Sequence, residues 1–221
     1  MAAMESQLDL LASGVSEEGP WIVLEKPSGW HTLEGRSGGT TVEAALRQLR
    51  PDVASLPEAG LVHRLDLGTS GCLLASTTPE GRERWRERWS RRGTRGVSKF
   101  YLADVVLRDG VAKLPRSGGF QLHFRSRYRR SAKVTVSDRG AAEERGECRW
   151  RTIRQDDRRS ELEIELLGPG RRHQIRAGFA ALGAPLVGDD LYGGPPADRL
   201  HLHAWRLAFD EQIVESPPPR W

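Results

Sequence analysis

The sequence has few cysteines, no long apolar run and no cluster of metal-binding motifs. Its 221 residues include only Cys72 and Cys148, too few for a disulfide framework or a four-cysteine metal site. No stretch approaches the roughly 20 apolar residues that cross a bilayer. The N-terminal segment carries acidic residues without the basic cluster of a secretory signal. We therefore expect no metal, no membrane contact and a cytoplasmic location, where thiols stay reduced.

Lysine is also scarce, although the chain is mildly basic overall. The net charge is +4, and of the 34 basic residues only Lys26, Lys99, Lys113 and Lys133 are lysines. The other thirty are arginines, whose planar guanidinium pairs with phosphate and stacks on bases. This excess suggests an anionic partner. A GC-rich genome, whose codons favour arginine, explains the same excess, so the composition alone does not decide between them.

The length favours a single domain with its own core. Hydrophobic residues make up 38% of the chain, and we see no internal repeat and no linker that would divide it. We expect residues 1–19 to be a loose lead-in and residues 20–221 to form one domain. Short strands mixed with a few helices, without a regular alternation of strand and helix, predict an α+β fold.

Apolar spacing gives a first map of the elements. Strands are expected at 21–24, 61–66, 72–75, 100–107, 161–166 and 200–209, and helices at 42–49, 79–92 and 174–182. In the second helix, Trp85 and Trp89 lie four residues apart and should pack inward, with arginines covering the other faces. Residues 116–147 are polar and resist assignment, apart from a short strand at 132–136.

Three segments carry side chains suited to chemistry. Asp66 follows His63 and Arg64 at a predicted strand end, where rigid scaffolds place reactive groups; alternatively, its carboxylate caps the following turn. His173 and Arg176 lie in the first turn of a predicted helix after a glycine-rich loop. That arrangement suits an anion, although a solvated basic helix start has the same pattern. Tyr101 lies in a strand, where core packing is its most frequent role.

Together these segments resemble the RluA-type family of pseudouridine synthases. His63-Arg64-Leu65-Asp66 with Thr69-Ser70-Gly71 resembles the signature around the family's catalytic aspartate. The other blocks follow the family's order: Lys26-Pro27-Ser28-Gly29, Lys99-x-Tyr101-x-Ala103, His173-Gln174-Ile175-Arg176, Gly188-Asp189 with Tyr192, and Leu202-His203-Ala204. The chain departs from the pattern at Leu67, where a polar or basic residue is frequent, and it matches weakly over 108–150.

The resemblance implies an enzyme that isomerises uridine in rRNA or tRNA to pseudouridine without cofactor or metal. It implies a mixed, mainly antiparallel central sheet with flanking helices and an active-site cleft. Asp66 would be the nucleophile or base, and the guanidinium of Arg176 would favour its charged form. Tyr101 would stack on the flipped base, and Arg64 would stabilise the gap that the base leaves. His63 would organise its loop, and Asp189 and Tyr192 are interpreted as structural.

Several points remain open at this stage. Asp66 could attack C6 of uracil, attack C1′ of the ribose, or remove the C2′ proton. The arginines of 79–92 and 125–130 could contact RNA phosphates, or they could pair with nearby glutamates. An S4-type RNA-binding domain is not expected in this chain, which we expect to act as a monomer. The alternatives are a decayed synthase scaffold that only binds RNA, and a hydrolase that releases uracil.

Overall fold

The structure is a computed structural model that describes residues 8–35, 38–126, 128 and 131–221. Arg127, Arg129 and Arg130, three of the predicted RNA contacts, lie outside the described residues, as does the start of the predicted lead-in. The strands are β1 (Asp9–Ser16), β2 (Gly19–Lys26), β3 (Ser70–Ser76), β4 (Ser98–Val106), β5 (Ser117–Arg125), β6 (Thr135–Ser137), β7 (Arg145–Gln155), β8 (Arg159–Leu167), β9 (Leu202–Phe209) and β10 (Gln212–Glu215). The helices are α1 (Val42–Leu49), α2 (Pro79–Ser90) and α3 (Gln174–Ala181).

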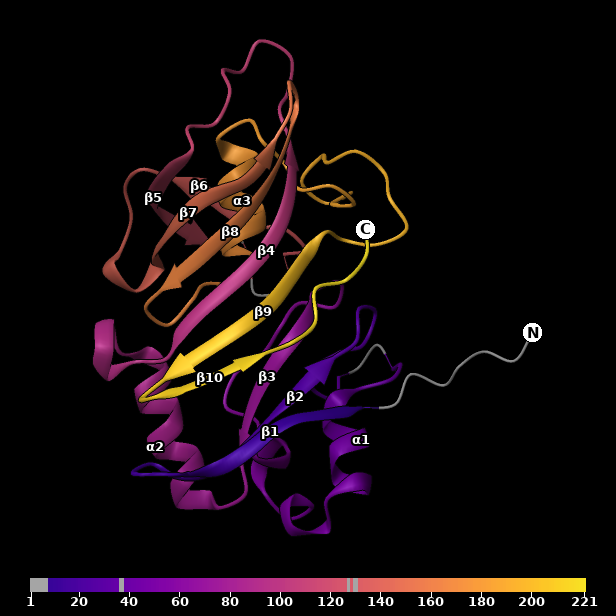
Figure 1. Ribbon diagram of the computed structural model, residues 1–221, viewed down its shortest axis with the longest axis vertical. Helices are drawn as coiled ribbons and strands as arrows, with labels where there is room; N and C mark the ends of the chain where they lie inside the picture. Colours follow the sequence, from indigo (N-terminus) through magenta and orange to yellow (C-terminus); the bar gives the residue numbers. More distant parts are fainter. Residues whose placement is uncertain (1–7, 36–37, 127, 129–130) are drawn as a thin grey trace, which may run out of the picture.

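All the described strands join one sheet, which runs from the N-terminal strands to β5 and β6 (Figure 1). The order is β1-β2-β3-β9-β4-β8-β7-β5-β6, and β10 pairs with β9. Among the described strands only β3 and β9 run parallel, so the expected mixed, mainly antiparallel sheet is confirmed. The late strand β9 lies between β3 and β4, which brings the segments before β3 and within β4 to the middle of the sheet.

The parallel contact between β3 and β9 depends on a glycine. Ser70 pairs with His203, and Gly71 pairs with Ala204. Gly71 has a φ of +110°, and a Cβ on it would lie 2.2 Å from the carbonyl oxygen of Ala204. Because a side chain there would collide with the neighbouring backbone, the sequence needs glycine at this position. The strand that follows the Asp66 loop can therefore approach β9 closely.

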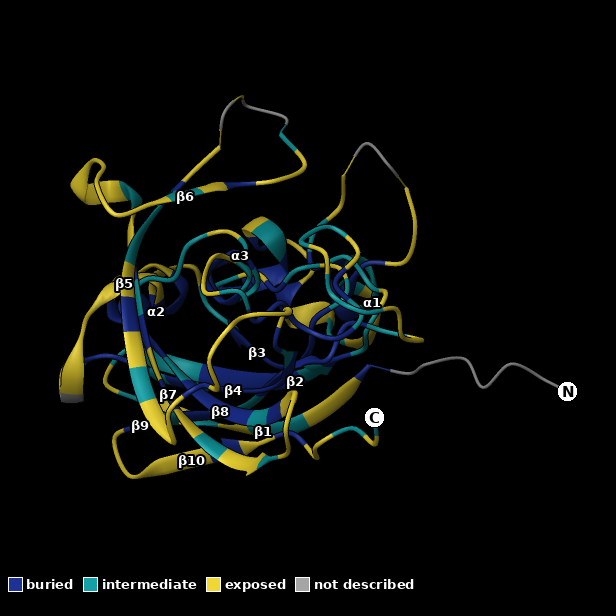
Figure 2. Cartoon of the chain, turned by 90° about the horizontal axis from the view of Figure 1, so that it is seen from above, coloured by how far each residue is buried: buried dark blue, intermediate teal, exposed yellow. Residues whose placement is uncertain are grey.

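Strands β2 and β3 are buried on both faces. In β2, Ile22 and Leu24 join a core cluster with α1 and α3, whereas Trp21 and Val23 join a second cluster with α2. Strands covered on both faces have continuous apolar runs instead of alternation, which explains the run that predicted this strand. Figure 2 shows α1 and α3 on the same side of the sheet.

Helix α2 confirms one expectation and corrects another. Thr78 accepts a hydrogen bond from the amide of Gly81 and caps the helix start. Trp85 and Trp89 pack inward, as predicted. The arginines do not all cover the outer faces, because Arg82 and Arg88 are themselves buried. The helix also ends at Ser90, two residues before the predicted end.

Arg88 shows how a buried guanidinium is compensated in this fold. It contacts Glu18 at 2.7 Å and Asp210 at 2.6 Å. Its guanidinium carbon lies 5.3 Å from the centre of the Trp85 ring. A buried charge is tolerated only when ion pairs and hydrogen bonds replace its water. Arg88 therefore ties α2 to the β1–β2 and β9–β10 turns.

Two other expectations from the sequence are wrong. Residues 1–19 were expected to form a loose lead-in, but Asp9–Ser16 form strand β1, which pairs with β2. An edge strand whose exposed and half-buried residues alternate weakly gives little periodic signal. The strand expected at 61–66 is reduced to a single bridge between Leu61 and Ala75. The chain then leaves the sheet, which carries Asp66 into the cleft described below.

The unassigned region 116–147 contributes strands β5 and β6 and the start of β7. Phe120 of β5 and Trp150 of β7 both pack edge-on against Phe179 of α3, with ring centres 5.7 and 5.4 Å apart. The short strand expected at 132–136 lies instead at Thr135–Ser137. This end of the sheet therefore supports α3. No helix in the described part of the chain has the length and apolar character to span a membrane.

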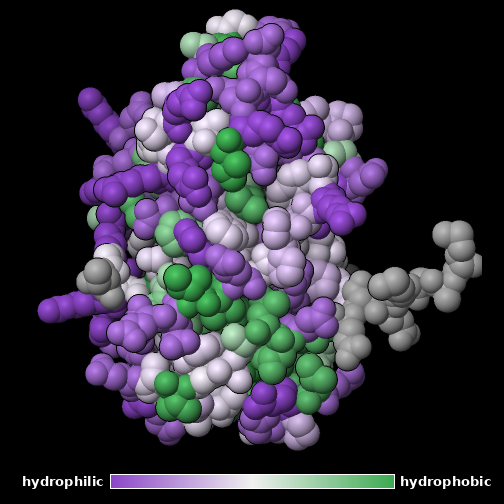
Figure 3. Space-filling view, viewed as in Figure 1, coloured by the Kyte–Doolittle hydropathy of each residue, from purple (hydrophilic) through white to green (hydrophobic). Residues whose placement is uncertain are grey.

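The face seen in Figure 1 has two halves of different character (Figure 3). Hydrophobic side chains gather in the lower half, over β1, β9 and β10, and hydrophilic ones dominate the upper half. Exposed apolar residues of these strands include Leu10, Val15 and Ile213. In Figure 2 these strands lie on the side away from α1 and α3.

Lys99 of β4 joins helix α2 to the loop before α3 from within the core. Its ammonium group donates to the carbonyl of Trp89 at 3.0 Å and to the carbonyl of Gly168. Only 1% of the residue is exposed, and burial lowers the pKa of its ammonium group to about 7. Lys99 thereby fixes the end of α2 against the loop that precedes α3.

We predict that Lys99 makes the protein more stable as the pH rises above neutrality. Between the native pKa of about 7 and an unfolded value of about 10.4, the unfolded chain binds the proton and the native chain does not. The free energy of unfolding should then rise with pH by on the order of 1 kcal/mol per pH unit from this group. We would measure the free energy of unfolding by urea at several pH values between 7.5 and 8.5. The slope of this free energy against pH should be smaller for Lys99→Met than for the wild type by that amount.

The matched control is Lys113→Met, because the Lys113 side chain is 55% exposed and, among the described residues, its ion pair is a surface contact with Asp157. Its slope should equal that of the wild type. Equal slopes for Lys99→Met and the wild type would contradict the assignment of a depressed pKa to Lys99.

Candidate active site around Asp66

The four residues singled out from the sequence line one cleft of about 930 Å³. Arg64 and Asp66 come from the loop before β3, Tyr101 from β4 and Arg176 from α3. The remaining walls come from the segment 31–35, from one side of α2 and from the segment 169–175. The structure thus brings together residues that lie up to 112 positions apart (64 to 176) in the sequence.

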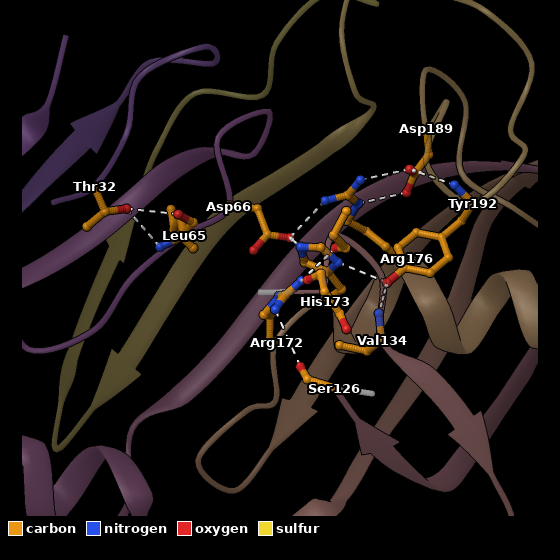
Figure 4. Close-up of polar contacts among 12 residues, drawn as sticks. Thr32, Leu65, Asp66, Ser126, Val134, Arg172, His173, Arg176, Asp189 and Tyr192 are labelled. Atoms are coloured by element: carbon orange, nitrogen blue, oxygen red, sulfur yellow. Dashed lines mark hydrogen bonds and ion pairs between the residues drawn. The ribbon is translucent and has the colours of Figure 1, made fainter. Parts of the chain in front are cut away.

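Asp66 faces Arg176 across the cleft (Figure 4). Its Oδ2 atom lies 3.2 Å from a terminal nitrogen of Arg176 and 3.8 Å from Nε2 of His173. The side chain is 26% exposed, so a ligand in the cleft can reach it. The turn is closed instead by the backbone, since the amide of Thr69 donates to the carbonyl of Asp66. Turn capping by the carboxylate is therefore not its role in this structure.

The loop around Asp66 is held in place by hydrogen bonds on both sides. The Thr32 hydroxyl donates to the carbonyl of Leu65 at 2.8 Å and accepts from its amide at 3.1 Å. On the other side, Lys26 donates to the carbonyl of Leu67 at 3.1 Å, and Ser28 donates to the carbonyl of Gly68 at 2.8 Å. The Lys-Pro-Ser-Gly motif therefore acts as a clamp on the Asp66 loop.

The ammonium group of Lys26 is enclosed by this clamp. The residue is fully buried, and its pKa falls to about 7. Burial is the largest cause, the negative charge of Asp66 opposes it, and Arg199 adds to it. The backbone carbonyls of Pro27 and Leu67 replace the water that the ammonium group has lost.

Arg176 is shared between two carboxylates. Its Nε and one terminal nitrogen contact Asp189 at 2.7 and 2.8 Å, in a two-point interaction. The other terminal nitrogen points to Asp66 (Figure 4). Burial lowers the pKa of the guanidinium, but Asp189 and Asp66 outweigh burial and raise it above its ordinary value. Asp189 is fully buried at its side chain, so it fixes the direction in which Arg176 points, which agrees with a structural role.

Tyr101 and Arg64 present different surfaces to the cleft. Tyr101 is buried, and burial, followed by the charges of Asp66 and Cys72, raises the pKa of its phenol above the ordinary value. The ring therefore stays neutral beside the carboxylate. Arg64 is exposed and has no ion-pair or hydrogen-bond partner for its side chain among the described residues.

His63 supports the loop as expected and is held neutral. Its Nε2 atom accepts a hydrogen bond from the amide of Leu74 at 3.0 Å, and its ring stacks on Trp89 with centres 3.7 Å apart. Burial, and then the charge of Lys99, lowers its pKa to about 3. A permanently neutral imidazole bonded to the backbone is a structural element of the loop.

The sequence analysis gave no role to three residues that matter here. Lys26 and His173 belong to motifs that the sequence analysis recognised, so those motifs already indicated that the two residues lie near the site. Thr32 had no signal, because its contact with Leu65 exists only after the chain has folded. In the part of the chain that the structure describes, no group of three or more histidine, cysteine, aspartate or glutamate side chains could hold a metal ion.

Comparison with known proteins agrees with this geometry. Residues 20–181 match the model of the family described as RNA pseudouridylate synthase. The chain belongs to this family. The RluA-type resemblance is therefore confirmed.

Related proteins and structures extend the comparison. A ribosomal large subunit pseudouridine synthase D from Xanthomonas campestris is 35% identical over 84% of this chain and 53% of its own length. One from Pseudomonas aeruginosa is 29% identical over 97% of this chain and 67% of its own length. The chain thus spans about half to two thirds of these relatives. The fold matches human RNA pseudouridylate synthase domain containing 1 with a TM-score of 0.68 at 20% identity, covering 100% of this chain and 86% of that one.

Proposed function

We propose that this chain isomerises uridine in RNA to pseudouridine, with the residues from β1 to the end of the chain, 9–221, as the catalytic domain. The observation that carries the proposal is the carboxylate of Asp66, held in an open cleft by Arg176. The names of the relatives refer to the large ribosomal subunit, and we therefore propose large-subunit rRNA as the substrate. Membership of the family supports the reaction type.

The reaction balances without an external oxidant, reductant or cofactor. The bond from N1 to C1′ breaks, a bond from C5 to C1′ forms, and the proton lost from C5 is matched by one gained at N1. One ionised carboxylate can serve by attack at C6, by attack at C1′ or by removing the C2′ proton. In each case Arg176 places a positive charge 3.2 Å from Oδ2 of Asp66.

Tyr101 and Arg64 are proposed to handle the flipped nucleotide. Extracting a base from its stack costs a few kcal/mol, and stacking on an aromatic ring returns ~1–3 kcal/mol. Tyr101 lines the cleft beside Asp66 and keeps a neutral ring, which suits that role. The unpartnered guanidinium of Arg64 is suited to stabilise the gap in the RNA.

Several arginines of α2 already have partners elsewhere in the protein, which leaves fewer of them to contact RNA. Arg82 pairs with Glu58, Arg88 pairs with Glu18 and Asp210, and Arg84 donates to a backbone carbonyl. Arg86 has no such side-chain partner among the described residues, and it lines the cleft. We therefore propose Arg86 as the phosphate contact of α2, in place of the whole arginine-rich helix.

We further propose that the protein works as a monomer in the cytoplasm. The four proposed site residues, Arg64, Asp66, Tyr101 and Arg176, already meet in one cleft within a single chain, so no second copy is needed to bring them together. Cys72 and Cys148 are both free and buried, which supports a reducing compartment.

The proposed chemistry predicts that Asp66→Asn abolishes pseudouridine formation and leaves RNA binding within about twofold of the wild type. The amide keeps the shape of the carboxylate but cannot attack or accept the proton. The assay maps pseudouridine in an unmodified large-subunit rRNA transcript and measures binding of the same RNA. Asp138→Asn, an exposed residue outside the cleft, is the control and should retain full activity. Wild-type levels of pseudouridine with Asp66→Asn would contradict the proposal.

The proposed RNA path predicts that Arg86→Ala weakens RNA binding and flattens its salt dependence. Each phosphate contact contributes roughly 0.7 to the slope of log affinity against log salt for a single strand. Binding of a labelled single-stranded oligouridylate, measured from 50 to 200 mM salt, should show that loss for Arg86→Ala. Arg149→Ala removes an exposed arginine of β7 that does not line the cleft, so it changes the net charge equally. Equal slopes for the two variants would refute the assignment of Arg86.

A further inference from the structure

His173 lies between Asp66 and Tyr192 at the entrance to α3 (Figure 4). Its backbone has φ 54° and ψ 22°, a left-handed conformation that costs a residue with a side chain roughly 1–2 kcal/mol. Its side chain is only 12% exposed, and the residue lines the cleft. The fold therefore maintains a strained backbone at the point where this imidazole meets the carboxylate.

The hydroxyl of Tyr192 determines the protonation of one ring nitrogen. It accepts a hydrogen bond from the amide of Val134 at 2.9 Å, and it lies 2.9 Å from Nδ1 of His173. The amide can only donate, so the hydroxyl is the acceptor there. Within the described chain, the remaining bonded neighbour for the hydroxyl proton is Nδ1. A hydroxyl oxygen can also accept a second hydrogen bond, but only donation to an unprotonated Nδ1 gives the hydroxyl proton a partner among the described residues, and we take this direction for the contact.

The opposite ring nitrogen faces a charge that selects the same tautomer. Nε2 lies 3.8 Å from Oδ2 of Asp66, and an ionised carboxylate can only accept hydrogen bonds. A proton on Nε2 is attracted to that oxygen, whereas a lone pair on Nε2 would be repelled. Tyr192 and Asp66, on opposite sides of the ring, thus both favour the neutral imidazole with its proton on Nε2.

Burial of the imidazole favours its neutral form. Burial is the largest influence, and it lowers the pKa of His173. Arg176 and Arg172 lower it further, while Asp66 and Asp189 oppose them. The pKa of His173 therefore lies below its ordinary value, so the ring can donate through Nε2 but does not carry a positive charge at neutral pH.

The contacts of Asp66 are not shared equally between its two oxygens. The terminal nitrogen of Arg176 and Nε2 of His173 both face Oδ2. No ion pair or hydrogen bond from another described side chain reaches Oδ1. One oxygen is thus held by the protein, and the other is left for a ligand in the cleft.

We propose that His173 is a positioning residue for Asp66, fixed by Tyr192 as the neutral tautomer with its proton on Nε2. With Arg176 it holds Oδ2, so that Oδ1 is the oxygen that meets the uridine. The tautomer is inferred from the contacts of the two ring nitrogens and from the burial of the ring, whereas its effect on catalysis rests on the proposed function.

The tautomer can be tested without any activity assay. Histidine labelled with ¹⁵N in the full chain gives signals that distinguish the two neutral tautomers and the cation, and a His173→Gln spectrum identifies the signal of His173. At pH 7 the wild type should show His173 neutral with its proton on Nε2. Tyr192→Phe should shift the signal toward a mixture of tautomers, whereas Tyr128→Phe, outside the cleft, should not. A cation, or a proton on Nδ1, in the wild type would overturn the proposal.

The catalytic consequence is tested by single-turnover and steady-state kinetics on the large-subunit rRNA transcript. His173→Leu should lower kcat by about tenfold or more with KM nearly unchanged, because misplacing a reacting group by about 1 Å can cost up to about a hundredfold. His173→Gln restores an N–H donor and should recover part of that loss. Equal kcat for the two variants, or a change in KM alone, would reject the positioning role. If the wild type forms no pseudouridine, the proposed function fails while the tautomer result still stands.

Discussion

The placement of one guanidinium between two carboxylates is the interaction on which the site depends. Arg176 bonds the buried Asp189 through two nitrogens and points a third at Asp66. A charge taken out of water has to be compensated by close partners. Asp189 supplies that compensation from the loop after α3, so the position of Arg176 is fixed by the protein itself. Asp66 thereby gains a fixed positive neighbour without losing its access to solvent.

The rest of the fold brings these partners into register. Strand β9 enters the sheet between β3 and β4, and Gly71 allows the close backbone contact that this requires. The clamp formed by Lys26, Ser28 and Thr32 then holds the loop before β3. Precise placement of a reactive group on a loop needs such support from its surroundings. The buried lysine of the first motif is thus explained by the loop that it holds.

The sequence predicted those parts of the structure whose signal is local. The apolar run of β2 and the two tryptophans of α2 lie in short segments, and both predictions are confirmed. The motif around Asp66 is local in the same way. Strand β1 was missed because an edge strand has weak alternation. Strand β5 was missed although Phe120, Leu122 and Phe124 alternate with polar residues in the strand pattern, because the whole region 116–147 was judged by its polar, arginine-rich composition.

Contacts between distant segments could not be predicted from such patterns. The burial of Arg82 and Arg88 depends on Glu58, Glu18 and Asp210, which lie 24, 70 and 122 residues away from them. Likewise, the partners of His173 become visible only in three dimensions. The motifs indicated which residues belong to the site, and the fold shows how Asp189, Tyr192 and Thr32 direct them.

Arg176 orients Asp66 through its geometry and also supplies a positive charge beside it. The variant Arg176→Lys separates these two contributions. Lysine keeps the charge but has no planar fork to bond both carboxylates. The decisive measurement is the single-turnover rate of pseudouridine formation in this variant, alongside its affinity for the same RNA. We predict a rate about a hundredfold lower with the affinity within about twofold of the wild type. A wild-type rate, or a loss of affinity that accounts for the whole effect, would contradict the account.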